Sequence, residues 1–328
     1  MQALKTFFVD GDTPMNWRDV AVMLAAIAVP PLIGVMLFGR IGAVAFVAAL
    51  PAHIAARDAG LQPAVVVTLV TGMAGMLVLG EPSLALPVAA ALAAMTSIAC
   101  QHGFAMPCLR ALFIWTIFTG PILPTEDLSG LFLIYLVAMG WSLGVTLIFF
   151  EVSELTRAER SSRTYSAAFG AALGVGLVIS IWVGRHFFGE HGFWFPLTFV
   201  VLWLPPFGEL FSRTAKRTVG TIIGTAISLV IALWIKLPWV SGVMGALALA
   251  LAFRLLPRSY VFFTACLTVT VLEALSLVSD LDHLATERIT TMFAAAVMTG
   301  LLGLLTFGAL RVLHPEAFRE LMETAPYD

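Results

Sequence analysis

Apolar stretches follow one another along the whole chain and are separated only by short polar turns. Runs of about 17 to 25 apolar residues are long enough to cross the hydrocarbon core of a bilayer as helices. The pattern predicts twelve such runs, at 18–38, 41–57, 61–80, 83–101, 104–122, 129–151, 163–184, 190–210, 215–235, 238–256, 258–278 and 284–311. We therefore expect an all-α integral membrane protein with about twelve transmembrane helices.

The composition supports a membrane environment. Of the 328 residues, 60% are hydrophobic and only 12% are charged, whereas about a quarter of the residues of soluble domains are charged. The net charge of −2 gives no indication of a nucleic-acid partner. Three cysteines without paired spacing indicate neither a disulfide framework nor a metal site. We therefore expect the lipid bilayer to be the main environment and partner of the chain.

The distribution of Lys and Arg predicts the orientation of the chain. With twelve spans both termini lie on one side of the membrane, and 14 of the 18 Lys and Arg residues fall on that side, against 4 on the other. Positively charged loops remain in the cytoplasm. We therefore expect both termini to be cytoplasmic.

An internal repeat relates the two halves of the chain. A shift of 145 residues superposes four marked positions: Arg18 on Arg163, Gly39 on Gly184, Arg40 on Arg185, and Pro51 on Pro196. Because six spans is an even number, the halves form a parallel repeat. The predicted organisation is a first six-helix repeat at 1–151, a cytoplasmic linker at 152–162, and a second six-helix repeat with a short tail at 163–328.

A helix with a basic start and a stripe of small residues follows the eighth span. Arg213, Lys216 and Arg217 precede an apolar run in which Gly220 and Gly224 lie on one face. Small residues let transmembrane helices approach closely. The basic residues are expected to anchor the cytoplasmic end, and the glycines to form a packing face.

The segment from Gly192 to Trp234 resembles the fusaric acid resistance and aromatic acid exporter superfamily. Trp194 corresponds to the aromatic residue at the outer start of a helix, and Arg217, Gly220 and Thr221 correspond to the Arg-x-x-Gly-Thr motif that opens the next one. The resemblance is clear over about a fifth of the chain. We expect no soluble domain in this sequence, and in this respect it departs from the larger exporters.

The resemblance implies a function. It suggests a secondary exporter in the bacterial cytoplasmic membrane that uses the proton gradient to expel small, often aromatic, organic acids. It further implies a periplasmic adaptor protein as a candidate partner and no cofactor, and a homo-oligomer is compatible with it. A passive organic-anion channel and a non-transporting membrane subunit of an adaptor-linked complex remain as alternatives.

Two residues within the predicted spans are candidates for carrying a proton. Glu273 lies well inside the eleventh span, where a carboxylate is costly and by default suggests a functional site. A salt bridge to Arg288, at the start of the next span, is the alternative. His53 in the second span is a candidate relay, and an interhelical hydrogen bond is its alternative.

Three arginines are candidates for attracting a substrate anion. Arg40 and Arg185 are equivalent in the repeat and lie at the outer ends of their spans, while Arg288 lies further inside. Rings of positive charge serve as constrictions in anion pores. The alternative for Arg40 and Arg185 is that their long side chains extend to the interfacial water.

Motifs of enzymatic chemistry are missing from the sequence. It has no Gly-rich phosphate-binding loop with Lys and Ser or Thr, no His-x-x-x-His pair and no Gly-x-Ser-x-Gly. We therefore expect neither ATP hydrolysis nor another catalytic activity in this chain.

Overall fold

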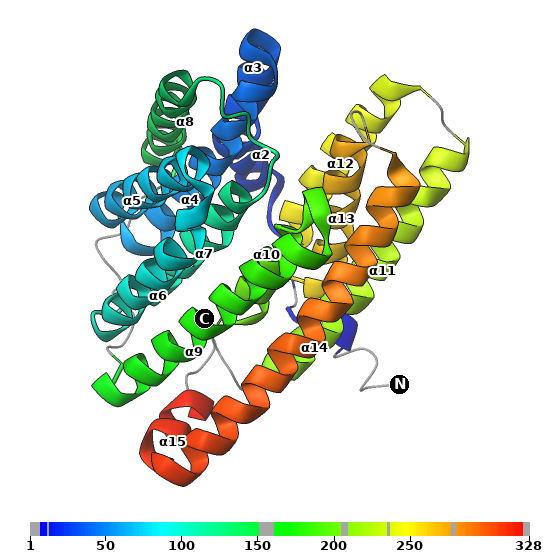
Figure 1. Ribbon diagram of the computed structural model, residues 1–328. Helices are drawn as coiled ribbons and strands as arrows, with labels where there is room; N and C mark the ends of the chain where they lie inside the picture. The colour runs from blue at the N-terminus through cyan, green and yellow to red at the C-terminus, as the bar shows by residue number, and fades with distance from the viewer. Residues whose placement is uncertain are drawn as a thin grey trace. The chain divides into compact units, whose positions relative to one another are not determined.

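The computed structural model describes residues 7–11, 13–150, 161–204, 209–234, 237–276 and 280–323. Every regular element within these residues is a helix (Figure 1). Most of the predicted linker at 152–162 lies outside the described residues. The predicted all-α class is therefore confirmed.

Seven helices in the described part of the chain are long and apolar enough to cross a membrane. They are Trp17–Ala59, Leu61–Gly80, Pro82–Gln101, Leu128–Phe149, Arg163–Phe187, Leu210–Trp234 and Leu281–Leu313. Three shorter apolar helices are Ala105–Thr119, Trp239–Leu255 and Tyr260–Leu275. The structure thus supports a multi-pass membrane protein, while the number of twelve spans stays a prediction.

The first of these stretches is not one straight helix. It contains α2 (Trp17–Ile27), α3 (Val29–Phe38), the 3-10 helix η1 (Gly39–Ala43) and α4 (Val44–Ala59). Gly39 has a φ of 62°, which glycine adopts without steric cost. After it the backbone of Gly42 returns to within contact of Gly34, where neither position has room for a Cβ. The sequence predicted a boundary between two spans at this point.

The contacts between residues divide the chain into two compact units. Unit 1 comprises Met1–Met23 and Phe211–Ala296, and unit 2 comprises Leu24–Leu210 and Val297–Asp328. This division does not follow the predicted boundary between the repeats. It reflects spatial contact rather than sequence similarity, so the six-helix repeats stay a prediction.

Unit 2 holds the larger hydrophobic core. Its elements after α4 are α5 (Leu61–Gly80), η2 (Pro82–Leu84), α6 (Ala85–Gln101), α7 (Ala105–Trp115), η3 (Thr116–Thr119), α8 (Leu128–Phe149), α9 (Arg163–Phe187), η4 (Gly189–His191), α10 (Trp194–Leu202), the end of α14 and α15 (Pro315–Glu323). Trp115, Tyr135 and Phe199 are fully buried in this core. Asp127 caps α8, because its carboxylate accepts hydrogen bonds from the Gly130 backbone N–H and the Ser129 hydroxyl, both at 2.8 Å. These bonds hold the pKa of Asp127 below its usual value.

A second pair of glycines in unit 2 repeats the arrangement of Gly34 and Gly42. Gly184, near the end of α9, contacts the backbone of Gly192, eight residues later, and again neither position has room for a Cβ. In both places a helix ends, a 3-10 turn follows and the next helix begins. The two pairs are 150 residues apart, whereas the predicted repeat is a shift of 145, so the repeat stays a prediction.

Unit 1 contains parts or all of four helices: α11 (Leu210–Trp234), α12 (Pro238–Leu255), α13 (Tyr260–Leu275) and α14 (Leu281–Leu313). The unit begins at Phe211 of α11 and ends at Ala296 of α14. The expected packing face of α11 is present: a Cβ at Gly220 would overlap the carbonyl of Val261, and one at Gly224 would overlap that of Ala265. Both contacts are with α13, so the absence of side chains brings the two helix backbones together.

The N-terminal segment is tied to the polar ends of the unit 1 helices. The carboxylate of Asp10 pairs with Lys216 and accepts a hydrogen bond of 2.8 Å from the Tyr260 backbone N–H. Arg254 donates a 3.0 Å hydrogen bond to the Met15 carbonyl and lies over the Trp17 ring. The sequence pattern gave no signal for these contacts, because the segment is short and lies outside the apolar runs.

Candidate functional site

Glu273 is buried in α13, with 1% of its surface exposed. It lies against α12, where a Cβ added to Gly245 would be 3.4 Å from the Cβ of Glu273. Its Oε1 atom is buried and has no hydrogen-bond partner among the described residues. Burying an ionised carboxylate without a partner is very costly, so a group in this position is a candidate for binding and releasing a proton.

The alternative for Glu273 was a salt bridge to Arg288. Because Oε1 has no partner among the described residues, that oxygen does not contact Arg288. Helical geometry also places Glu273 away from α11. Thr264 faces α11, and Glu273 follows nine residues later at about 100° per residue, which places it on the opposite side of α13.

Arg217 is turned into unit 1 rather than toward the surface. Only 2% of the residue is exposed. One terminal nitrogen of its guanidinium lies 3.3 Å from the Tyr260 hydroxyl, and its Nε has no hydrogen-bond partner among the described residues. The expectation that the whole basic start of α11 anchors the membrane interface is therefore incomplete. Lys216 pairs at the surface with Asp10, while its neighbour Arg217 belongs to the interior.

Arg288 is a second buried cation in the same unit. It lies in the third turn of α14 and is 6% exposed. Unit 1 therefore contains two buried arginines, one from the predicted motif and one from the predicted anion-binding residues.

Hydroxyl groups accompany these cations. Thr221, Thr225 and Ser228 of α11 and Thr264 of α13 are all at most 1% exposed, and their hydroxyls have no hydrogen-bond partner among the described residues. Of these, only Thr221 was singled out as a candidate from the sequence. The signal for Thr225 was its spacing, because Arg217, Thr221 and Thr225 recur every four residues and share one helix face.

His53 is fully buried in α4 of unit 2. Its Nδ1 lies 2.8 Å from the Thr146 hydroxyl of α8. The Thr146 hydroxyl donates a hydrogen bond to the Ser142 carbonyl. The oxygen of Thr146 is therefore the acceptor toward His53, and the Nδ1–H of a neutral imidazole is the donor. The interhelical hydrogen bond expected as the alternative is present. Nε2 has no partner among the described residues, so it retains a lone pair.

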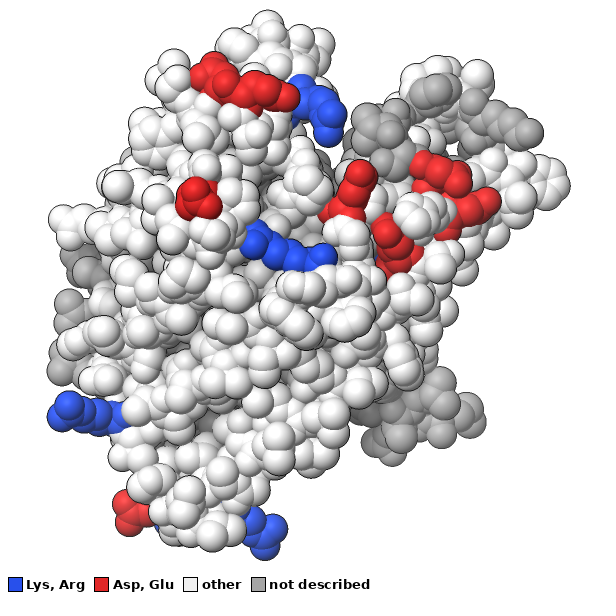
Figure 2. Space-filling view, viewed as in Figure 1, with Lys and Arg blue, Asp and Glu red and all other residues white. Residues whose placement is uncertain are grey.

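Arg40 and Arg185 lie in different environments within unit 2. Arg40 is exposed in η1. Arg185 donates to the carbonyl of Pro82 at 2.8 Å and, through Nε, to that of Thr119 at 3.4 Å. Arg185 thus connects the end of α9 to η2 and η3. Figure 2 shows how few charged side chains lie on one face of the molecule.

Trp194 begins α10 and is 2% exposed. Its ring is stacked on that of His191, with the ring centres 4.9 Å apart and the planes at 27°. A membrane-interface aromatic would contact lipid, whereas this one is enclosed by protein.

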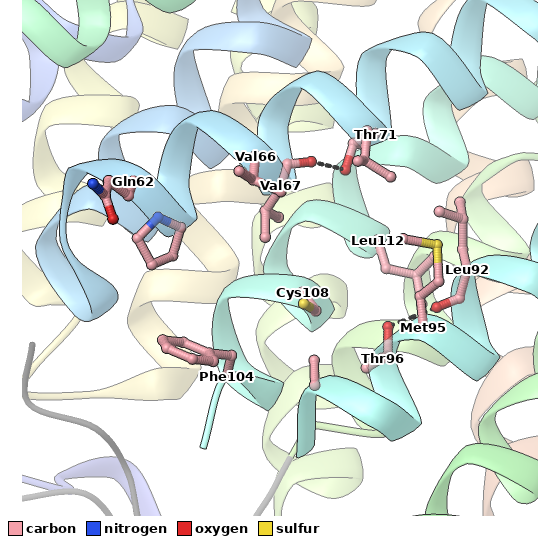
Figure 3. A pocket seen from close by; sticks show the side chains of 13 residues that line it. Gln62, Val66, Val67, Thr71, Leu92, Met95, Thr96, Phe104, Cys108 and Leu112 are labelled. Atoms are coloured by element: carbon pink, nitrogen blue, oxygen red, sulfur yellow. Dashed lines mark hydrogen bonds between the residues drawn. The ribbon is translucent and has the colours of Figure 1, made fainter. Parts of the chain in front are cut away.

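A cavity of about 420 Å³ lies between α5, α6 and α7 of unit 2. Its lining is mainly apolar, with Val66, Met95 and Leu112 among its residues (Figure 3). The hydroxyls of Thr71 and Thr96 in this lining donate to carbonyls of their own helices. The cavity therefore offers little to a charged ligand.

No group of three or more His, Cys, Asp or Glu residues in the described ranges could hold a metal ion. The charged groups that are buried lie in helices long and apolar enough to span a bilayer or in the shorter apolar helices beside them. These features define the class as a multi-pass helical membrane protein.

Comparison with known proteins gives one match, over part of the chain. Residues 179–303 match the model of a family described as fusaric acid resistance protein-like. This match confirms the resemblance over these residues, which are less than half of the chain. It covers α11, α12, α13 and most of α14, and so includes Arg217, Glu273 and Arg288. No curated protein and no solved structure matches the chain significantly.

Proposed function

We propose that the protein is a secondary exporter of small organic acids, aromatic ones among them, driven by the proton gradient. The family match over residues 179–303 supports a transporter, and seven apolar helices of spanning length support a location within the bilayer. The proposed setting is the bacterial cytoplasmic membrane, with both termini inside and two parallel six-helix repeats.

The observation that carries proton coupling is the environment of Glu273. It is an acidic group enclosed by α12 and α13, with one oxygen that has no partner among the described residues. Removal of a carboxyl group from water disfavours its charged form in general, and exposure to water favours it. Such a change is what proton-driven export requires of one residue. His53, whose Nε2 retains a lone pair, is the second candidate and lies in unit 2.

A passive organic-anion channel is the second candidate function. Buried arginines favour anion passage without any need for proton transfer, and Arg217 and Arg288 are such residues. A membrane subunit that anchors an adaptor protein is the third candidate, and it requires no solute flux. The periplasmic adaptor and a homo-oligomer are proposed partners that follow from the family resemblance.

The experiment that separates these functions is transport by proteoliposomes containing the full chain. Release of labelled benzoate is measured with and without an imposed pH gradient. For Glu273→Gln we expect loss of the gradient-dependent part of the flux, because the amide cannot bind and release a proton. Asp282→Asn, an exposed acid in the same unit, is the matched control and should transport like the wild type.

Flux that ignores both the gradient and the Glu273→Gln substitution would indicate the channel instead. No flux with a panel of aromatic acids would leave the anchoring subunit as the favoured function. Helical content and monodispersity of each variant confirm that it is folded before transport is compared.

A further inference from the structure

We propose that the cavity of about 420 Å³ between α5, α6 and α7 is a binding site for an uncharged aromatic molecule that enters from the lipid phase. The inference rests on the proposed export of organic acids. It assigns a place for the aromatic rings of such an acid while its carboxyl group is protonated. The sequence pattern gave no signal for this site, because its lining residues come from three different helices.

The cavity has three helical walls, all within unit 2. α7 packs against both α5 and α6, whereas α5 and α6 have little contact with each other. Leu112 of α7 lines the cavity and is 2% exposed. α7 therefore forms the enclosed back of the cavity, and α5 and α6 form its two sides.

The open side of the cavity lies between α5 and α6. Val66 of α5 is 60% exposed and Met95 of α6 is 48% exposed, and both line the cavity. These two helices belong to stretches that are long and apolar enough to cross a membrane. Apolar side chains exposed on such helices lie against lipid tails. A molecule that enters between them therefore comes from hydrocarbon rather than from water.

The chemistry of the lining excludes a charged ligand. None of the thirteen described residues that line the cavity is Asp, Glu, Lys, Arg or His. The Thr71 and Thr96 hydroxyls donate to carbonyls of their own helices, at 2.7 and 2.8 Å. Removing a carboxylate from water without an opposite charge is very costly. The acid would thus bind in its protonated form, which is also the form that dissolves in hydrocarbon.

Three side chains of the lining suit an aromatic ring. Phe104 offers ring stacking or edge contacts, and Met95 and Cys108 offer polarizable sulfur atoms. These contacts distinguish a ring from a saturated acyl chain. An apolar cavity of about 150 Å³ accommodates benzene, so this larger cavity has room for two fused rings.

One end of the cavity is polar. Figure 3 shows Gln62 and Phe104 at one end of the lining, and Leu92 and Leu112 at the other. Gln62 lies in the first turn of α5 and is exposed. Its carboxamide offers both donors and an acceptor, which complement the O–H and the carbonyl of a protonated carboxyl group. The rings would lie among the apolar residues, with the carboxyl group toward Gln62.

The test is binding of radiolabelled naphthamide to the full chain in lipid nanodiscs, with empty nanodiscs as the blank. Naphthamide has two fused rings and an uncharged head with donors and an acceptor, whereas naphthoate has the same rings and is charged at neutral pH. We expect saturable binding of naphthamide. Competition by naphthoate should be weaker by about tenfold or more, because the cavity offers no compensating charge.

Two phenylalanine substitutions on α6 form a matched pair. Ala99 lines the cavity, so Ala99→Phe places a ring inside it and should abolish saturable binding. Ala94 is exposed on the same helix and is not part of the lining, so Ala94→Phe should bind naphthamide like the wild type.

The polar end is tested by Gln62→Leu. This variant should weaken naphthamide binding by about threefold, the effect of one hydrogen bond between neutral groups. Binding of methylnaphthalene, which has no polar head, should not change. Equal effects on both probes would mean that Gln62 does not contact the head.

Cys108 reports where the probe binds. In a chain with Cys100→Ala and Cys266→Ala, Cys108 is the remaining thiol, and it lies in the lining. We expect naphthamide to slow the alkylation of Cys108 by N-ethylmaleimide. It should have no such effect when Ala99→Phe is added.

Three results would overturn the inference. They are the absence of saturable naphthamide binding, which would leave the cavity to lipid acyl chains, equal competition by naphthoate and naphthamide, and wild-type binding in folded Ala99→Phe. If Ala99→Phe does not fold, Val67→Phe takes its place, because Val67 also lines the cavity. Unchanged binding in that variant contradicts the site.

Transport of labelled naphthoate by proteoliposomes separates this inference from the proposed function. Gradient-dependent export at the wild-type rate in Ala99→Phe would retain the exporter and reject the cavity as a substrate site. Saturable naphthamide binding that Ala99→Phe abolishes, without any flux in the wild type, would retain the site and reject export.

Discussion

At the scale of single residues, the side chains of most interest are polar groups that are buried from solvent. Glu273, Arg217 and Arg288 are each at most 6% exposed, and each has a cost that the rest of the fold must offset. The sequence identified Glu273 and Arg288 because charges within apolar runs are conspicuous. It placed Arg217 at the membrane interface together with Arg213 and Lys216. The sequence does not show in which direction each of these three side chains points.

The hydrogen bond between His53 and Thr146 leads to a prediction at this scale. Thr146→Val removes the acceptor of the Nδ1 proton and leaves a second buried polar atom on His53 without a partner. The cost of such a change is about 1–3 kcal/mol. We expect a lower unfolding temperature in detergent, with gradient-dependent transport retained if His53 acts only in packing.

Thr290→Val is the control for this change. Thr290 is exposed, and its hydroxyl bonds only to carbonyls of its own helix, so its removal should leave the unfolding temperature nearly unchanged. Equal stability of the two variants would show that the His53–Thr146 bond contributes little. Loss of gradient dependence in folded Thr146→Val would instead favour His53 as a proton relay.

At the scale of elements, close approach of helix backbones is the recurring feature. Gly220 and Gly224 allow α11 to contact carbonyls of α13, and the pairs Gly34–Gly42 and Gly184–Gly192 allow a helix and the following turn to touch. Lipid provides little hydrophobic driving force for helices to associate, so close backbone contacts of this kind contribute to the packing. The sequence predicted the small face of α11, but not the helix that it contacts.

Gly224→Ala tests the packing of α11 on α13. The added methyl group would overlap the Ala265 carbonyl, and overpacking of this kind typically costs about 1–3 kcal/mol. We therefore expect a lower unfolding temperature in detergent.

Gly242→Ala provides the matched comparison. Gly242 lies in α12 of the same unit, and a Cβ there meets nothing within 4 Å. This variant should be as stable as the wild type or slightly more so, because alanine is the better helix former. A similar loss of stability in both variants would mean that the effect of Gly224→Ala is not due to contact with α13.

At the scale of the whole molecule, the charge distribution predicts the orientation. The count of 14 Lys and Arg residues on one side against 4 on the other depends on the number of spans, because one additional span would exchange the sides of all later loops. The structure gives seven helices of spanning length and three shorter apolar ones in the described residues. Orientation and span number are therefore tested together.

Labelling of single cysteines in a background without Cys100, Cys108 and Cys266 provides that test. We expect a membrane-impermeant reagent to label Glu190→Cys in intact cells. Thr13→Cys and Arg319→Cys should react only after the cells are permeabilised, because both termini are predicted to be cytoplasmic. All three positions are exposed. Labelling of one terminus alone in intact cells would mean an odd number of spans.

The sequence alone determined the class of protein, because apolar runs of spanning length leave few alternatives to transmembrane helices. Its motif around Arg217 and Thr221 also indicated the family that the match over residues 179–303 supports. These properties depend on the composition of the chain and on the order of neighbouring residues, and both can be read from the sequence.

The tertiary structure decided which groups meet. Rotation about a helix axis places Thr264 toward α11 and Glu273 toward α12, although both lie on α13. It also brings Arg217 to the Tyr260 hydroxyl, and it pairs Asp10 with Lys216. Such contacts depend on helix rotation and on pairing between distant segments, and a hydrophobic pattern along the chain specifies neither.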